Sequence, residues 1–477
     1  MAARVRADKD RAMGFRWQHY HTVWLWLFLA WMFCYIDRSL TGPVVSWMIG
    51  HNVAFLSDAP MPHALGGLIG GMFFAGYMLT QFPAGYLGDK YGRKVMIVLS
   101  TALASITTLI TGLARSLVAF VAARVLTGLV EGAYYSNDRA LLTSVTPERV
   151  RGLAQGVIFA GLAVGLTVAT VATPVMLDAF ASWWGAESSW FLPFIIFAVP
   201  TALVALGVWK FVRDPHGGSG YLRPLSRLLA ICAVFLAAIM AAFYLTLDLR
   251  LGDVAQAAVV LAVAGVLIAV IYVFLGAKSS AVLKDRNLVL MYVSAIPILY
   301  TLWFFGFWAL LLVSESASLG ISGAALYAGF FGVANVAGYP LGGRIYDRAR
   351  ARGGARTRPY VLLCSAVAAL VLLLGAYLHL GGADRLVLGV LIFAIGVPFA
   401  AMQTVHMTLT ADLAPLGSMG QAFGMWNLVA EIGALLSPVV SGALRDLTGG
   451  WAAPAVLNGA LLLISAALVR SVRRKNN

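Results

Sequence analysis

Runs of about twenty apolar residues recur along this 477-residue chain, and they restrict its fold more than any other feature. A helix of about twenty residues crosses a 30 Å hydrocarbon layer. Only 11% of the residues are charged, whereas soluble domains carry about 25%. We expect fourteen membrane-spanning helices, near residues 22–45, 64–86, 95–113, 117–137, 153–177, 191–212, 225–246, 255–275, 288–312, 323–343, 359–379, 386–410, 420–443 and 452–470.

The length and uniformity of these runs exclude a membrane β-barrel, whose strands alternate over about ten residues. The sequence therefore predicts an all-α membrane protein. With the N-terminus placed in the cytoplasm, cytoplasmic segments hold 28 of the 34 Lys and Arg residues, outer segments 4 and the spans 2. This asymmetry follows the positive-inside rule. It predicts a multi-pass protein of the bacterial inner membrane with both termini cytoplasmic, whose basic residues contact lipid rather than nucleic acid.

Two patterns occur once in each half of the chain. Gly85 begins a Gly-x-x-x-Asp-basic motif at the end of the second span, and Gly343 begins another at the end of the tenth. A second pair of glycines, nine residues apart, occurs at 156 and 165 and again at 424 and 433. Parallel repeats are typical of secondary transporters. We therefore expect two six-helix bundles, 1–213 and 288–477, joined by a segment (214–287) that contains a cytoplasmic linker and an inserted two-helix hairpin.

Three motifs resemble those of the major facilitator superfamily. The stretch GYLGDKYGRK at 85–94 is similar to the loop between its second and third spans, RVLTG at 124–128 to its fourth-span motif, and PERVRG at 147–152 to its loop before span five. The resemblance covers the chain outside the hairpin. It implies the major facilitator fold, extended here to fourteen transmembrane helices by two extra central helices.

Four charged residues lie where the hydrocarbon core is expected: Asp37, Arg38, Arg124 and Glu131. Ionisable residues at this depth usually pair, face the bundle interior and serve transport. Protonation of both acids would leave two guanidinium groups free to bind an organic anion. We interpret Asp37 and Glu131 as proton-coupling residues, and Arg38 and Arg124 as substrate-binding residues. The alternative is a pair of buried salt bridges that only fix helix packing.

The same residues resemble a subgroup of the superfamily. YIDRS at 35–39, the stretch 74–85 and the seven-residue spacing of Arg124 and Glu131 are similar to the anion:cation symporters. That resemblance implies proton-coupled uptake of an organic anion, such as a sugar acid or other carboxylate, by alternating access. Lysolipid and sphingolipid carriers have a similar arrangement of acids and arginines. The alternative is therefore a proton-coupled exporter or carrier of amphiphilic, lysolipid or drug-like substrates.

Other polar residues interrupt the spans. Tyr77 and Gln81 lie one helical turn apart and could bind substrate, although interhelical hydrogen bonding explains them equally well. We assign Asn427 to substrate binding. Glu431 and His406 are possible second proton sites; a packing role is the alternative for both.

Charged residues cluster in the cytoplasmic loops of this chain. The resemblance to the superfamily implies that they form a gating network that closes the cytoplasmic side. The alternative is that they are solvated charges that only set the topology. These residues are Asp89, Arg93, Glu148, Arg149, Arg151, Asp347 and Arg348.

The sequence contains no motif that indicates an enzymatic reaction. The nucleotide-binding motif G-x-x-x-x-G-K-[ST] does not occur, and the three cysteines have no metal-site spacing. We therefore expect a transporter that is not an enzyme, uses no cofactor or metal, and acts as a monomer on a small anion and protons.

Overall fold

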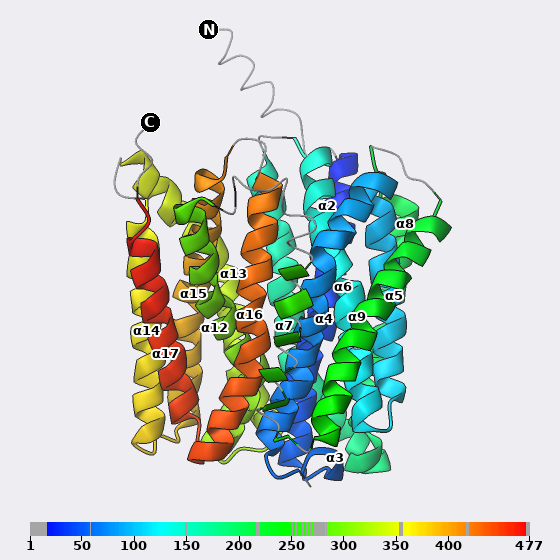
Figure 1. The fold of residues 1–477 in the computed structure, drawn as a ribbon. Coiled ribbons are helices and arrows are strands. Elements are labelled where there is room, and N and C mark those ends of the chain that lie inside the picture. Colours follow the sequence, from blue (N-terminus) through cyan, green and yellow to red (C-terminus); the bar gives the residue numbers. More distant parts are fainter. Residues whose placement is uncertain are drawn as a thin grey trace.

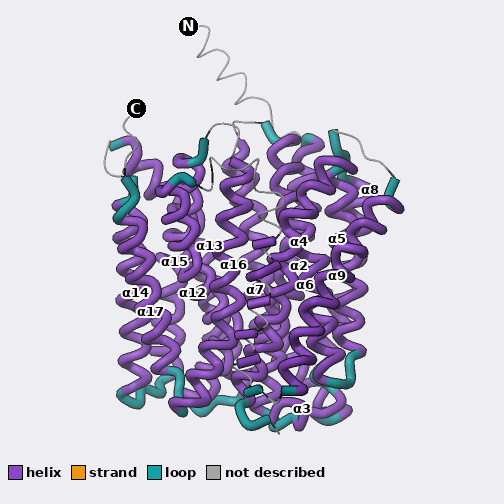
Figure 2. Tube along the Cα trace, viewed as in Figure 1, coloured by secondary structure: helices purple, strands orange, loops and turns teal. Residues whose placement is uncertain are grey.

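The chain folds into a bundle of long, roughly parallel helices in a computed structural model (Figure 1). Short loops join the helices at both ends (Figure 2), and the described residues form no strand. The structure describes residues 17–473, except 58, 148–149, 216–219, 250, 253–254, 257, 260–261, 264, 268, 271–281, 283, 353–355 and 416–418.

The first bundle comprises six long helices. They are α2 (His19–Gly50), α4 (Pro62–Tyr91), α5 (Arg93–Leu113), α6 (Leu117–Val145), α7 (Arg151–Trp184) and α8 (Leu192–Phe211), with the short helices α3 (Ala54–Ser57) and η2 (Ala186–Ser188).

The second bundle repeats this plan. It comprises α12 (Arg286–Ser316), α13 (Ile321–Ala351), α14 (Arg358–His379), α15 (Arg385–Leu413), α16 (Met419–Thr448) and α17 (Ala452–Arg470).

Along the chain, α9 (Leu222–Asp248) follows the first bundle and is the first helix of the inserted hairpin. Thirteen helices in the described part of the chain are long and apolar enough to cross a membrane. The expected span 255–275 is described only as separate helical fragments. The all-α membrane fold of two six-helix bundles with a central insertion is thus confirmed.

Several helices are longer than the apolar runs predict. The run at 117–137 becomes α6, which continues through Asp138 and Arg139 to Val145. Hydropathy detects only the apolar part of a membrane-spanning helix. The helix itself continues for as long as its backbone hydrogen bonds are satisfied. Ends are set by local chemistry: the Ser116 hydroxyl caps α6, and Gly92, at φ 106°, separates α4 from α5.

Glycines bring the helices of each bundle into close contact. A Cβ on Gly128 would lie 1.9 Å from the carbonyl oxygen of Phe73 on α4, and one on Gly433 would lie 2.0 Å from that of Ile296 on α12. Small residues allow such backbone approach, which drives helix association in membranes. The glycine-rich sequence of α4 and α6 therefore sets the close packing of two helices that both contribute residues to the candidate site.

The two bundles meet at one end of the molecule and separate at the other. The described chain begins and ends at the same end, hereafter the terminal end, at the top of Figure 1. At the opposite, far end, a Cβ on Gly67 of α4 would lie 2.2 Å from Pro438 of α16, and one on Gly442 2.3 Å from His63. Toward the terminal end, Gly156 on α7 and Gly424 on α16 have no atom of the described residues within 4 Å of such a Cβ. Among the described residues, the bundles are therefore packed tightly at the far end and less tightly at these two positions toward the terminal end.

Candidate functional site

The four charged residues predicted in the core come together between α2 and α6. Asp37 is 2% exposed, Arg38 5%, Arg124 0% and Glu131 1%. Arg124 Nη1 lies 3.4 Å from Asp37 Oδ1, and Arg38 Nη2 lies 3.3 Å from Glu131 Oε2. Because Arg124 and Glu131 lie two turns apart on α6, both face α2 and its two adjacent charges. Each acid is thus paired with an arginine of the other helix.

The two carboxyl groups also approach each other. Asp37 and Glu131 lie close enough to each other to interact electrostatically. Glu131 Oε1 and the Nε atoms of Arg38 and Arg124 have no hydrogen-bond partner among the described residues. The cluster therefore keeps polar atoms that are free for further hydrogen bonds.

Aromatic rings hold the guanidinium of Arg38. Its central carbon lies 4.1 Å from the centre of the Tyr77 ring and 4.7 Å from that of Tyr35. Cation–π contacts of this kind stabilise a desolvated cation. Tyr77, predicted to bind substrate, here supports Arg38.

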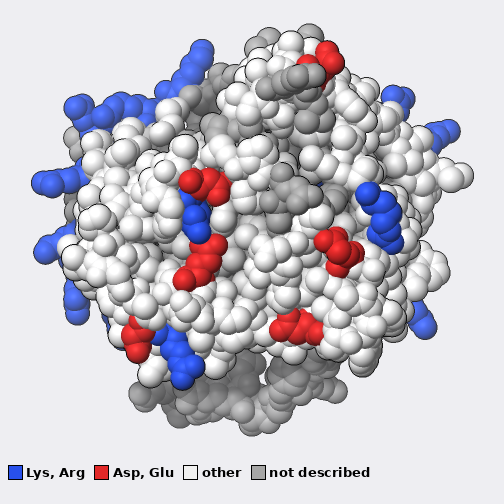
Figure 3. Space-filling model, turned by 90° about the horizontal axis from the view of Figure 1, so that it is seen from below, with Lys and Arg blue, Asp and Glu red and all other residues white. Residues whose placement is uncertain are grey.

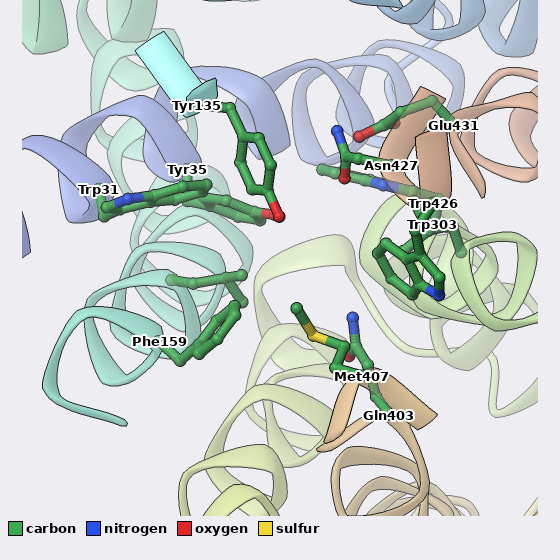
Figure 4. Close-up of a pocket in the computed structure, with 12 residues that line it drawn as sticks. Trp31, Tyr35, Tyr135, Phe159, Trp303, Gln403, Met407, Trp426, Asn427 and Glu431 are labelled. Carbon is green, nitrogen blue, oxygen red and sulfur yellow. The ribbon is translucent and has the colours of Figure 1, made fainter. Parts of the chain in front are cut away.

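A cavity lies between the bundles (Figure 4), and Tyr35 in its wall contacts Arg38 of this cluster. Its empty space is about 380 Å³, open region included. In Figure 4 the Tyr135 hydroxyl points into the space between the bundles. The lining side chains come from α2, α6 and α7 of one bundle and α12, α15 and α16 of the other; they are Trp31, Tyr35, Tyr135, Phe159, Leu162, Leu299, Trp303, Gln403, Met407, Trp426, Asn427 and Glu431.

Two residues predicted to bind substrate contact each other across the bundles. Asn427 Nδ2 on α16 donates to Gln81 Oε1 on α4 over 2.7 Å. Gln81 Nε2 has no partner among the described residues. Glu431, one turn beyond Asn427, lines the cavity and lies close enough to Arg38 to interact with it electrostatically. The second bundle thus adds an amide and an acid to the site.

His406 is held in a packed network. Its Nδ1 accepts from the indole of Trp426 over 2.9 Å, so Nε2 carries the proton and donates to the Ser294 hydroxyl over 2.8 Å. This is the geometry of a neutral, fully buried histidine. It favours the packing role for His406.

The predicted gating residues are only partly described. Arg93 forms an ion pair with Asp89 over 3.2 Å and donates to the carbonyl of Ala140 over 3.0 Å. Asp347 and Arg348 are exposed on α13. Glu148 and Arg149 lie outside the described residues, and of Arg151 only the backbone is described.

The sequence analysis missed a third acid on the inward face of α6. Asp138 is fully buried and accepts from the indole of Trp31. The guanidinium of the adjacent Arg139 lies 5.0 Å from the Trp31 ring and 4.8 Å from that of Phe159. The sequence pattern that could have identified Asp138 is its spacing: Arg124, Glu131 and Asp138 are each seven residues apart. They therefore share one face of the helix, which continues past the predicted end of the span.

A second missed cluster joins the bundles at the far end. His63 of α4 contacts Asp446 Oδ1 through Nδ1 at 2.5 Å and Glu315 Oε1 through Nε2 at 3.0 Å. Glu315 also accepts from Arg445 over 2.7 Å and from the Trp451 indole over 2.8 Å. These residues lie hundreds of positions apart in the chain, so no local pattern indicates the cluster.

Comparison with known proteins agrees with this architecture. The family model described as Major Facilitator Superfamily matches residues 27–329 and 304–477. The chain is 24% identical over 447 residues to a probable sulfoacetate transporter of Cupriavidus necator, covering 92% of this chain and 90% of that protein.

It is also 24% identical over 455 residues to a D-galactonate transporter of Escherichia coli, covering 92% of each chain. Among solved structures, a bacterial homologue of the human lysosomal transporter Spinster superposes with a TM-score of 0.68 at 16% identity, covering 96% of this chain and 97% of the other.

Proposed function

Because the chain belongs to the Major Facilitator Superfamily, a family of transporters, we propose that it is a secondary active transporter that takes up an organic anion together with protons. The observation that carries the proposal is the buried cluster of two acids and two arginines beside a cavity between the bundles. Its relatives are named as transporters of sulfoacetate and D-galactonate, which supports an organic anion as substrate.

Linkage provides the coupling. With all four groups ionised, the cluster is neutral and each arginine is occupied by an acid. Protonation of Asp37 or Glu131 weakens its ion pair and frees positive charge for an anion. A bound anion in turn favours the protonated acids, because coupling between two binding sites is reciprocal. Proton and substrate are therefore carried together without any covalent step.

Alternating access follows from the way the bundles meet. We place the terminal end in the cytoplasm, because the predicted basic segments lie there. Figure 3 looks onto the far end, where acidic and basic side chains are sparse and most basic ones stand at the rim. On this assignment the structure is inward-facing, closed outside by the His63 cluster. Reorientation would open that cluster and bring the terminal ends of the bundles together.

A carrier of amphiphilic, lysolipid or drug-like substrates is the second candidate. The observation that favours it is the apolar character of much of the cavity wall. Such a carrier would move amphiphiles and leave hydrophilic acids untouched.

Uptake into proteoliposomes tests both functions. A panel of radiolabelled organic acids is offered to vesicles with and without an inward proton gradient. We expect one class of acid to accumulate with the gradient. In Glu131→Gln accumulation is expected to fall to background while substrate counterflow survives, because the amide keeps a polar partner for Arg38 but cannot carry a proton.

Asp248→Asn is the matched control, since it neutralises an exposed carboxylate on the inserted hairpin. Unchanged uptake in Glu131→Gln would remove this acid from the coupling mechanism. Proton-dependent movement of an amphiphile, without uptake of any hydrophilic acid, would replace the symporter by the second candidate.

A further inference from the structure

The cavity wall is rich in aromatic rings. Six of its twelve lining side chains are aromatic, and three more are aliphatic or thioether groups. Ligand sites with such walls hold an apolar body and orient it by a few polar groups. The aromatic residues come from both bundles; they are Trp31, Tyr35, Tyr135, Phe159, Trp303 and Trp426.

Several polar atoms of the wall are already occupied. The indole N–H of Trp31 donates to Asp138 and that of Trp426 to His406. The Asn427 amide donates to Gln81, and Gln403 Oε1 accepts from the hydroxyl of Tyr339 over 3.1 Å. A polyhydroxy acid would depend on the polar atoms that remain, and buried hydroxyls left unpaired are costly.

The charges favour a single anionic group. Arg38 packs on Tyr35 at the edge of the cavity, whereas Arg124 is completely buried behind Phe73 and Asp37. Glu431, in the wall itself, has an Oε2 without a hydrogen-bond partner in the described chain. An ionised Glu431 would repel a second anionic group.

We propose that the preferred substrate is an aromatic monocarboxylate, an inference that rests on the proposed function. Its ring lies between the aromatic side chains of the two bundles, and its carboxylate is directed toward Arg38. Stacked and edge-to-face ring contacts discriminate in favour of an aromatic body. The bidentate fork of a guanidinium suits the carboxylate.

Calorimetric titration of the purified full-length chain in detergent tests this preference directly. The probes are benzoate, cyclohexanecarboxylate, phthalate and gluconate, which vary the ring, the number of charges and the hydroxyl groups. We expect benzoate to bind about tenfold more tightly than cyclohexanecarboxylate, from one or two ring contacts. Phthalate and gluconate should bind more weakly than either.

Substitutions in the wall test the role of the rings. Trp303→Leu and Phe159→Leu should each remove most of the preference for benzoate over cyclohexanecarboxylate, and Trp303→Phe should restore it. Trp209→Leu is the matched control, because Trp209 is 53% exposed on the outer face of α8. Phe159 is only half-buried, so its substitution tests the idea even where Trp303→Leu impairs folding.

The outcomes separate this inference from the proposed function. Binding of gluconate or phthalate in preference to benzoate, with gradient-driven uptake of the same acid, would overturn the aromatic preference and leave the symporter intact. A preference for benzoate that survives both wall substitutions would overturn it as well. If no organic anion binds or exchanges, the proposed function itself fails, and the inference fails with it.

Discussion

At the residue scale, the site consists of charges that depend on one another. Asp37 and Arg124 are both buried, and each is the ion-pair partner of the other. Burial makes an unpaired charge far more costly than a missing pair. The cluster to which we assign transport is therefore also expected to stabilise the first bundle.

A double-mutant experiment measures this dependence. Arg124→Gln leaves Asp37 without its cation, so we expect a loss of about 3–5 kcal/mol of stability. The double variant Asp37→Asn/Arg124→Gln removes both charges and should recover much of that loss. Thermal unfolding in detergent measures both variants. Equal stability of the single and double variants would mean that the pair makes no energetic contribution.

At the scale of helices, glycines decide how closely elements pack. The backbones of α4 and α6 touch at Gly128, and these two helices carry Tyr77, Gln81, Arg124 and Glu131. A shift of α6 away from α4 would also disturb the ion pairs that Arg124 and Glu131 of α6 form with Asp37 and Arg38 of α2. Helix spacing is therefore part of the geometry of the site.

Alanine substitution tests this spacing. Gly128→Ala would place a methyl group 1.9 Å from a backbone oxygen, so the helices must move apart, at a cost of about 1–3 kcal/mol or more. Gly156→Ala on α7 meets nothing within 4 Å and should be neutral or stabilising by up to about 1 kcal/mol, as alanine favours helix. The melting temperature in detergent should therefore fall for Gly128→Ala and stay the same or rise for Gly156→Ala. A fall of similar size in both variants would contradict the role of close contact at Gly128.

At the scale of the whole molecule, the conformation depends on what joins the bundles. The His63 cluster links α4 to α12 and α16 at the far end. The hydrogen bond between Gln81 and Asn427 links α4 to α16 beside the cavity. On the proposed cycle of alternating access, these contacts are expected to break when the bundles reorient. Their strength therefore helps to set the balance between the closed and open states of the far end.

Removing one charge at the far end should shift this balance. Glu315→Gln weakens charge-assisted hydrogen bonds to His63, Arg445 and Trp451, each worth about 1.5–3 kcal/mol. We expect the far-end-open state to become at least about tenfold more populated, as 1.4 kcal/mol is a factor of ten. Spin-label distances across the far end measure this population. Asp384→Glu is the control, since Asp384 caps α15 without contacting the cluster. An unchanged distance distribution would show that the cluster does not hold the far end closed.

The sequence by itself determined the membrane fold, the helix count outside the hairpin's second helix, the two-bundle repeat and the four core charges. These follow from local patterns: apolar length, glycine spacing, and ionisable groups at membrane depth. Only the tertiary structure decided which acid pairs with which arginine, because Asp37 and Arg124 lie on different helices. It also revealed Asp138, beyond the apolar run, and the cluster of His63, Glu315 and Asp446. Contacts between residues far apart in the chain arise from helix packing, and no local pattern encodes them.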